Sequence, residues 1–485
     1  MGHYDALLYR RGWLLTDLPD PQFADALSQE TFKRFTVMPF ARWRVFYDPC
    51  VPTALATSGK NAALLLGFAL NPFDGCNDET AIAKKLLDCR SRSERCFLEK
   101  LSELSGRFAL ALYEHGNLEI YTDACATRTV FYDTSGCGVA VSSHATLLAD
   151  LLGYELSDDA CYFFYHPLYR TAPLKRLPGL TAPFEHLRPL TPNTKLNPVT
   201  GQITRIFPLG VLPPCADYPT LEREIAALMK RQAEMLHRRT PIQMSLSAGL
   251  DSRFTLAACR SFADDLHFFT HQTKNPVHRE DTATAAAICN RFGLSHSIYQ
   301  WDNQRYKSNF DEFETIWLRN LGLPRGLAWL NKIYADDWPE GTVHLRSNIA
   351  EVAKADLSDR GRYPFCPQTL ARLYTTTPMQ NDPRVLDAMQ EFIDVTGFTE
   401  RNLRNYDFYD LFEWEQIMCQ WLGWLLLESD IAHDTVQLFN NRKILSKMLS
   451  IPYEDRKSRK LFFGVIRRLW PELLEFPVNG TLYPV

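Results

Sequence analysis

The sequence predicts a mixed α/β chain in which a β-rich first part precedes a parallel α/β sheet and a helical C-terminal part. Residues 1–205 carry many short β-type segments, and residues 242–301 alternate between strand and helix patterns. Beyond about residue 305 the pattern is mostly helical. We therefore expect one domain over residues 1–205, a linker over 206–219 and a second domain over 220–485.

The first part is predicted to be rich in strands because apolar and aromatic segments alternate with short turns that contain Gly, Asp or Asn. Helical patterns interrupt these segments at residues 78–87 and 145–152. The expected strands cover residues 6–9, 43–47, 62–66, 108–113, 118–121, 130–132 and 139–141.

The second part begins after a proline-bearing connector with a helical apolar period over residues 220–239. Strands are then expected to alternate with helices, and this alternation predicts a parallel sheet with its ligand at the carboxyl ends of the strands. The expected strands are 242–246, 266–270 and 296–301, and the expected helices are 252–260 and 280–292.

The composition excludes several classes of function. With 53 basic and 57 acidic side chains, the net charge of −4 gives no general attraction to nucleic acid or to an anionic membrane. The twelve cysteines show neither Cys-x-x-Cys pairs nor zinc-ligand spacing, which is typical of reduced thiols. No secretion signal or membrane-spanning stretch is found. We expect a cytoplasmic protein of enzyme size that has no nucleic-acid or membrane partner.

The most informative segment is Met-Ser-Leu-Ser-Ala-Gly-Leu-Asp-Ser-Arg at residues 244–253. A strand that runs through a small-residue loop into a helix binds phosphate with backbone N–H groups and the helix dipole. Gly249 allows close approach of the backbone, and a carboxylate such as Asp251 beside polyphosphate requires a Mg²⁺ between them. The alternative is an ordinary strand–helix turn. The expected ATP-binding residues here are Leu246, Ser247, Ala248, Gly249, Leu250, Asp251 and Ser252.

This loop resembles the Ser-Gly-Gly-x-Asp-Ser pyrophosphate loop of the ATP pyrophosphatases, with Ala248 in place of the first glycine. The form that follows Leu and ends in Asp-Ser-Arg is most similar to the asparagine synthetase family. The resemblance implies cleavage of ATP to AMP and pyrophosphate, with Mg²⁺ bound by Asp251. It also places the adenine along the strand that contains Thr270.

Four segments of the first part, at residues 104–111, 118–123, 130–132 and 141–143, resemble the class II glutamine amidotransferase domains. That resemblance implies an αββα sandwich of the N-terminal nucleophile type, as in the domain order of asparagine synthetase.

The start of the chain departs from that family, because Met1-Gly2-His3-Tyr4 lacks the cysteine that hydrolyses glutamine. We therefore expect no glutaminase activity; a misassigned start is the alternative. Loss of this cysteine resembles the β-lactam synthetases and the lasso-peptide cyclases, which couple a carboxylate to an amine already in the substrate.

The resemblance also implies further site residues. Residues 343–351 match the second acidic motif of the family only loosely, and Glu351 falls where a metal-binding Asp is expected. Asn348 departs from the motif, and Arg346 is a candidate for contact with a phosphate or a substrate carboxylate. Asp281 is interpreted as a helix N-terminal acid rather than a catalytic group.

Near the C-terminus the family has a lysine that contacts the phosphates, and the resemblance leaves Lys457 or Lys460 as the catalytic candidates. A solvated, charged surface is the alternative interpretation of this segment. A general base near the amine is also expected. Glu428, Asp430 and Tyr363 are the candidates for it, and no sequence pattern selects among them.

The function implied is an AMP-forming ligase that uses ATP and Mg²⁺, but not glutamine, to couple a carboxylate to an amine. We expect a small-molecule or peptide substrate and, as further partners, proteins of a biosynthetic pathway. A non-catalytic scaffold in a biosynthetic complex is the main alternative. Thiolation or tRNA modification is a lesser one, because the chain lacks a sulfur-relay cysteine pair and a basic surface.

Overall fold

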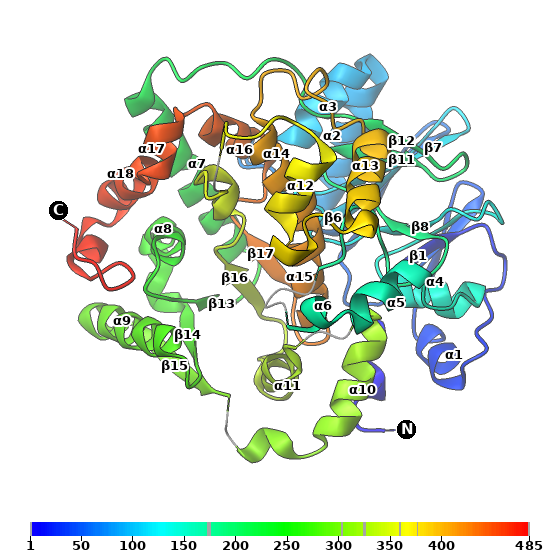
Figure 1. Cartoon of the computed structure of the whole chain (residues 1–485), viewed down its shortest axis with the longest axis horizontal. Coiled ribbons are helices and arrows are strands. Elements are labelled where there is room, and N and C mark those ends of the chain that lie inside the picture. The colour runs from blue at the N-terminus through cyan, green and yellow to red at the C-terminus, as the bar shows by residue number, and fades with distance from the viewer. Residues whose placement is uncertain are drawn as a thin grey trace.

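The computed structural model describes residues 2–171, 176–301, 304–323, 326–357, 360–375 and 377–483. Within these residues the strands form two antiparallel sheets of six strands each and one parallel sheet of five. Figure 1 shows the antiparallel sheets among the blue and cyan elements on the right, and the first strands of the parallel sheet in green on the left. The predicted mixed α/β class is confirmed.

The first antiparallel sheet has the strand order β10-β8-β9-β1-β3-β2. Its outer face packs on helices α1 (Ala26–Phe32) and α4 (Ala145–Leu152), whose Phe32 and Leu148 share one core with the sheet. The strands are β1 (Trp13–Thr16), β2 (Thr36–Phe40), β3 (Trp43–Tyr47), β8 (Phe131–Asp133), β9 (Ala140–Ser142) and β10 (Leu187–Pro189).

The second antiparallel sheet has the order β12-β11-β7-β6-β5-β4, and its strands alternate their side chains between two cores. Leu64 and Leu66 face the first sheet, whereas Leu65 faces helices α2 (Glu79–Arg92) and α3 (Glu94–Ser102). The strands are β4 (Thr53–Ser58), β5 (Asn61–Leu70), β6 (Ser105–Glu114), β7 (Asn117–Thr122), β11 (Thr194–Asn197) and β12 (Gln202–Arg205). The layers therefore run helix, sheet, sheet, helix, as expected.

The strand expected at residues 6–9 is wrong. A 3-10 turn, η1 (Asp5–Leu7), occupies this segment, and Tyr9 and Arg11 have φ values of 52° and 56° that no extended strand allows. The aromatic and apolar composition reflects burial instead, because Tyr9 is inaccessible to solvent and its hydroxyl hydrogen-bonds to Asp150.

The parallel sheet has the order β15-β14-β13-β16-β17. Its strands are β13 (Ile242–Ser245), β14 (His267–Gln272), β15 (Ser295–Gln300), β16 (Val343–Arg346) and β17 (Thr435–Gln437). The chain moves from β13 to one side through β14 and β15, and then returns to the other side at β16. The order of the strands therefore reverses between β13 and β16, and such a reversal opens a ligand crevice beyond the carboxyl ends of the strands.

Two helices of this sheet start earlier than the sequence pattern suggests. Helix α8 begins at Leu250 inside the small-residue loop, and α9 begins at Pro276 after an Asn275 cap. The long helix α7 (Tyr218–His237) precedes β13, close to where a helix was expected.

The remaining helices cover the sheet and fill the space between it and the sandwich (Figure 1). Helices α14 and α15 flank the π-helical segment η6 (Glu413–Gly423), and this continuous run is almost wholly buried. The helices are α5 (Asp158–Tyr165), α6 (Pro167–Thr171), α8 (Leu250–Ala258), α9 (Pro276–Phe292), α10 (Phe310–Leu321), α11 (Ala328–Asp337), α12 (Pro367–Tyr374), α13 (Pro383–Thr396), α14 (Phe408–Phe412), α15 (Trp424–Ser429), α16 (Arg442–Leu449), α17 (Tyr453–Lys457) and α18 (Lys460–Leu469).

A buried cluster of charges joins the sandwich to the segment around β17. Arg107 donates to both carboxylate oxygens of Asp430, with 2.8 Å between Nη2 and Oδ2, and to Asp434 over 3.1 Å. Arg128 donates to Asp434 over 2.7 Å, and Arg11 donates to the Asp430 carbonyl over 2.5 Å. Burial acts to raise the pKa of the Asp434 carboxyl, but the three arginines together hold it well below its usual range.

Candidate functional site

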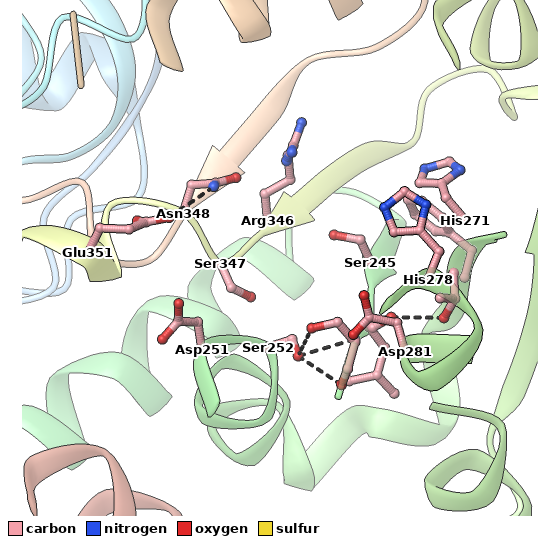
Figure 2. Close-up of a pocket in the computed structure, with 14 residues that line it drawn as sticks. Ser245, Asp251, Ser252, His271, His278, Asp281, Arg346, Ser347, Asn348 and Glu351 are labelled. Carbon is pink, nitrogen blue, oxygen red and sulfur yellow. Dashed lines mark hydrogen bonds between the residues drawn. The ribbon is translucent and has the colours of Figure 1, made fainter. Parts of the chain in front are cut away.

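A pocket of about 290 Å³ lies at the reversal point of the parallel sheet. Figure 2 shows that its lining comes from the ends of β13, β14 and β16 and from helices α8 and α9. The volume is close to the lower limit for small-molecule sites. The lining residues are Ser245, Leu246, Ser247, Asp251, Ser252, Phe269, Thr270, His271, His278, Asp281, Arg346, Ser347, Asn348 and Glu351.

The predicted phosphate loop is closed by the side chain of Ser252. Its Oγ accepts from the Ser247 N–H over 3.2 Å, contacts the Ser247 hydroxyl over 3.0 Å, and lies within hydrogen-bond distance of the Gly249 carbonyl. Leu250 opens helix α8 directly after this loop. Because the first N–H groups of a helix have no intrahelical acceptor, the loop presents donors at the pocket.

Asp281 is part of this loop structure rather than a helix N-terminal acid. Helix α9 begins five residues before it, and its first turn carries no acidic residue. The Asp281 carboxylate instead accepts a hydrogen bond of 2.8 Å from the Ala248 N–H and lines the pocket. The earlier helix start explains the error, because Pro276 and Asn275 supply the start and the cap.

Arg253 connects the phosphate loop to the C-terminal segment by hydrogen bonds, a role that the sequence pattern did not indicate. The residue is fully buried, and its guanidinium donates to the carbonyls of Ala248, Leu473, Phe476 and Pro477. Burial lowers the pKa of this guanidinium to about 10. The arginine therefore ties the phosphate loop to the C-terminal segment of the chain.

The structure brings Glu351 to the same pocket as Asp251, as the resemblance implied. Glu351 lies in the short 3-10 helix η4 (Ala350–Ala353), and its Oε1 accepts from the Asn348 amide over 3.3 Å. Its Oε2 is shielded from water and has no hydrogen-bond partner among the described residues. Burial and the charge of Asp251 both raise the pKa of Glu351. Two neighbouring carboxylates with a free buried oxygen form a set that fits a Mg²⁺.

Lys354 is the cation that the structure places beside the phosphate loop. Its Nζ lies 2.7 Å from Asp251 Oδ2 and 3.5 Å from Asp356 Oδ2. Burial acts to lower the pKa of Lys354, but Asp251 and Glu351 outweigh it and raise this pKa. Asp251 and Lys354 are 103 residues apart in the sequence, so no local pattern could have paired them.

The catalytic candidates Lys457 and Lys460 lie elsewhere, and neither lines the pocket. Both are exposed; Lys460 pairs with Asp455 over 2.8 Å, and Lys457 lies over the ring of Tyr453. Helix α17 ends at Lys457, and the chain turns before α18 starts at Lys460. Both ammonium groups therefore stay on the surface.

Arg346 and Thr270 lie at the pocket as expected. The Thr270 hydroxyl donates to the Leu246 carbonyl over 2.8 Å, so it fixes the end of β13 against β14. The Arg346 side chain makes no ion pair or hydrogen bond with the part of the chain that the structure describes. Figure 2 shows its side chain extending away from Asp251 and Ser252. The pocket therefore has a carboxylate end and a guanidinium end.

The three candidates for the general base do not line this pocket. Glu428 is buried within 3.4 Å of the Asn331 amide, and Asp430 belongs to the buried charge cluster. Tyr363 lies against the guanidinium groups of Arg362 and Arg372. Their positions give no support to a role as base.

No family model and no curated protein matches the chain. Solved structures that match include a glutamine-dependent NAD⁺ synthetase from Acinetobacter baumannii in complex with ADP, at 18% identity. The alignment covers 32% of this chain and 28% of that one, with a TM-score of 0.18, so this chain spans about a quarter of that protein.

Two further solved structures match larger parts of the chain. The B. subtilis glutamine phosphoribosylpyrophosphate amidotransferase, complexed with ADP and GMP, is 9% identical over 80% of this chain and 75% of its own, with a TM-score of 0.23. A structure of the allosteric regulatory enzyme of purine biosynthesis is 9% identical over 66% and 74%, with a TM-score of 0.25. Scores this low carry no functional argument, so the function must be inferred from the site.

Two further properties of the described residues bear on the function. None of the helices among them is long and apolar enough to cross a membrane. No group of three or more His, Cys, Asp or Glu side chains in the described ranges could hold a metal ion. A Mg²⁺ at Asp251 and Glu351 therefore needs ligands from a bound phosphate.

Three histidines cluster near the guanidinium end of the pocket; His271 lines the pocket, whereas His344 and His433 are buried. His271 hydrogen-bonds to the Tyr334 hydroxyl over 2.8 Å, and His344 to the Ser245 hydroxyl over 3.0 Å. His433 packs against His344, with 5.1 Å between ring centroids. Burial lowers the pKa of His271 to about 3, and it lowers those of His344 and His433 well below their usual range.

These histidines predict a loss of stability in mild acid. A histidine whose pKa is depressed in the folded state contributes stability that is present above pH 6.5 and lost as the pH falls, because only the unfolded chain gains the proton. For His271, whose pKa in the folded state is about 3, this loss at about pH 5 is about 2 kcal/mol. Urea unfolding of His271→Gln is expected to show a flatter pH dependence than the wild type. The exposed His3→Gln is the control, and equal slopes for His271→Gln and the wild type would refute the prediction.

Proposed function

We propose that this chain is an ATP-dependent ligase that activates a substrate carboxylate as an acyl-adenylate and couples it to an amine. The observation that supports this most strongly is the convergence of the phosphate loop after β13 with Glu351 after β16, at the reversal point of a parallel sheet. Independence from glutamine remains the sequence-based expectation given above.

In the first step a carboxylate oxygen of the substrate attacks the α-phosphorus of ATP, the bond to the β-phosphate oxygen breaks and pyrophosphate leaves. In the second step the amine nitrogen attacks the acyl carbon, AMP leaves and the nitrogen loses a proton. Such chemistry depends on positioning and charge stabilisation rather than on a protein nucleophile. A Mg²⁺ that arrived with ATP would neutralise charge on the pyrophosphate, and Asp251 and Glu351 would hold it.

The residues of the pocket have distinct proposed roles. The loop from Ser247 to Ser252 binds the pyrophosphate through its N–H groups, while Ser252 keeps the loop closed. Thr270 keeps β14 in register at the adenine side. The Arg346 guanidinium has no partner in the described chain, and we assign it to an anionic group of the substrate or nucleotide.

A non-catalytic scaffold is the second candidate. It is favoured by one observation, because polar groups of the loop already have partners within the protein. The Asp281 carboxylate accepts a hydrogen bond from the Ala248 N–H, and Lys354 forms an ion pair with Asp251. Binding measurements separate the two candidates, since a scaffold has no need for nucleotide.

The test is the binding of α,β-methylene-ATP, which cannot be cleaved between the α- and β-phosphates, by titration calorimetry with and without Mg²⁺. The wild type is expected to bind in a Mg²⁺-dependent manner. Asp251→Ala should weaken this binding by roughly 100-fold, which corresponds to the loss of one charged contact. Substrates would then be sought by the release of AMP and pyrophosphate.

Asp264→Ala is the matched control, because Asp264 is exposed, follows helix α8 in the chain and does not line the pocket. It should bind like the wild type. Absence of binding by the wild type under both conditions would contradict the ligase and favour the scaffold. Equal affinities for the wild type and Asp251→Ala would contradict the assignment of the loop.

A further inference from the structure

The Lys354 ammonium group lies where it can pair either with the Asp251 carboxylate or with a phosphate bound at the loop. Its Nζ is 2.7 Å from Asp251 Oδ2, on the carboxylate that the proposed function assigns to Mg²⁺. Glu351, one turn earlier, has an Oε2 that is shielded from water and lacks a partner among the described residues. The ammonium group therefore pairs with the Asp251 carboxylate, while Oε2 of Glu351 has no partner among the described residues.

The backbone of Lys354 is held by hydrogen bonds through both its N–H and its carbonyl. Its N–H donates to the Glu351 carbonyl over 3.0 Å, and its carbonyl accepts from Arg459 over 2.5 Å. The neighbours Ala353 and Ala355 are buried. A lysine carries its charge as a compact point on a flexible four-carbon stem, so the ammonium can change partner without movement of the backbone.

Charge balance indicates what would make it change partner. Among the described residues, Lys354 is the cation within ion-pair distance of Asp251, and it also lies 3.5 Å from Asp356. A metal ion that took Asp251 and Glu351 would repel the ammonium, whereas the phosphates bound with that metal would attract it. A metal ion that binds without phosphate has only the two carboxylates as protein ligands. It must also displace the Lys354 ammonium from Asp251, and no phosphate is then present to pair with that ammonium.

We propose that Lys354 keeps the metal position closed until a nucleotide arrives, and that it then contacts the phosphates as the cation of the adenylation site. This inference rests on the proposed function for its second half. The first half, exclusion of a free metal from Asp251, stands on the ion pair and the unpartnered Glu351 oxygen alone. Because Lys354 leaves Asp251 only when phosphates are present, binding of the metal and binding of the nucleotide become cooperative.

The experiment measures Mn²⁺ binding by electron paramagnetic resonance, with Mn²⁺ as the probe for Mg²⁺, on the wild type and on two neutral variants. Lys354→Met and Lys354→Gln are both used, so that failure of one to fold leaves the test intact. We expect the variants to bind Mn²⁺ alone at least about 10-fold more tightly than the wild type, as expected when a competing cation leaves a carboxylate. With Mn²⁺ present, they should bind α,β-methylene-ATP about 10-fold more weakly, because one phosphate contact is lost.

Lys447→Met is the matched control, because Lys447 forms an ion pair of similar length with Glu224, at 2.8 Å, and does not line the pocket. It should leave both affinities unchanged. Equal Mn²⁺ affinities for the wild type and the Lys354 variants would overturn the exclusion of metal. Unchanged nucleotide affinity would overturn the contact with phosphate. Failure of the wild type to bind nucleotide with Mn²⁺ would refute the proposed function and the contact with phosphate, while the measurement with Mn²⁺ alone would still decide the exclusion.

Discussion

Asp430→Asn is expected to lower the free energy of unfolding by about 4 kcal/mol, because it leaves buried arginine charge without its counter-charge. Arg107 is inaccessible to solvent and donates two hydrogen bonds to this carboxylate. Arg128 also lies 3.6 Å from it. Arg107 and Arg128 lie against the carboxylates of Asp430 and Asp434, and Arg11 donates to the Asp430 carbonyl, so removal of one negative charge leaves excess positive charge where water is excluded.

Urea unfolding at neutral pH measures this effect, and Glu99→Gln serves as the control. Glu99 pairs with Arg95 over 2.5 Å, but more than half of each side chain is exposed, and such pairs contribute at most about 1 kcal/mol. The double variant Arg107→Met/Asp430→Asn should recover part of the loss, since it removes the unpaired charge together with its partner. If Asp430→Asn cost no more than Glu99→Gln, the cluster would not hold the sandwich to the β17 segment.

Arg253→Met is expected to loosen the C-terminal segment and the phosphate loop together. Four carbonyls, those of Ala248, Leu473, Phe476 and Pro477, accept hydrogen bonds from this one guanidinium. Methionine fills much of the same space but donates nothing. We expect a local destabilisation of about 3 kcal/mol, because hydrogen bonds from a charged donor contribute more than neutral ones and the carbonyls lose their partner.

Hydrogen exchange followed by mass spectrometry measures this, with attention to residues 471–483 and to the loop peptide. The expected loss of protection in both peptides would appear as faster exchange of more than 100-fold, which about 3 kcal/mol permits. Arg260→Met is the matched control, because Arg260 donates to the Leu469 carbonyl near the same segment but is about half exposed. Faster exchange in the C-terminal peptide alone would show that Arg253 does not support the loop.

Much of the fold could be predicted from the sequence because its determinants are local. Strands β5, β6 and β7 follow from apolar runs broken by short turns, and β13 and β14 follow from their alternation with helices. The segment at residues 6–9 could not be assigned correctly, since a buried turn and a buried strand have the same composition. The start of α9 was missed because its Asn cap and Pro precede the apolar periodicity.

In the site, too, the residues of a local motif could be predicted, whereas contacts between distant segments could not. Ser247, Asp251 and Ser252 were predicted from one continuous motif, and the structure brings Glu351 and Arg346 to the same pocket. The lysine was sought near the C-terminus through a family resemblance, whereas the structure places Lys354 at Asp251. A motif specifies the loop that contains it, but not which distant side chain comes to face that loop.

By itself, the sequence determined the α/β class, the strand–loop–helix around residues 244–253 and the carboxylate that this loop presents, because each depends on residues close together in the chain. The tertiary structure alone decided the reversal of strand order between β13 and β16, the buried histidines and the pairing of Lys354 with Asp251. The physical reason is that parallel strands bring their carboxyl ends to one edge whatever their separation in sequence. Which strands become neighbours there depends on the burial of whole surfaces.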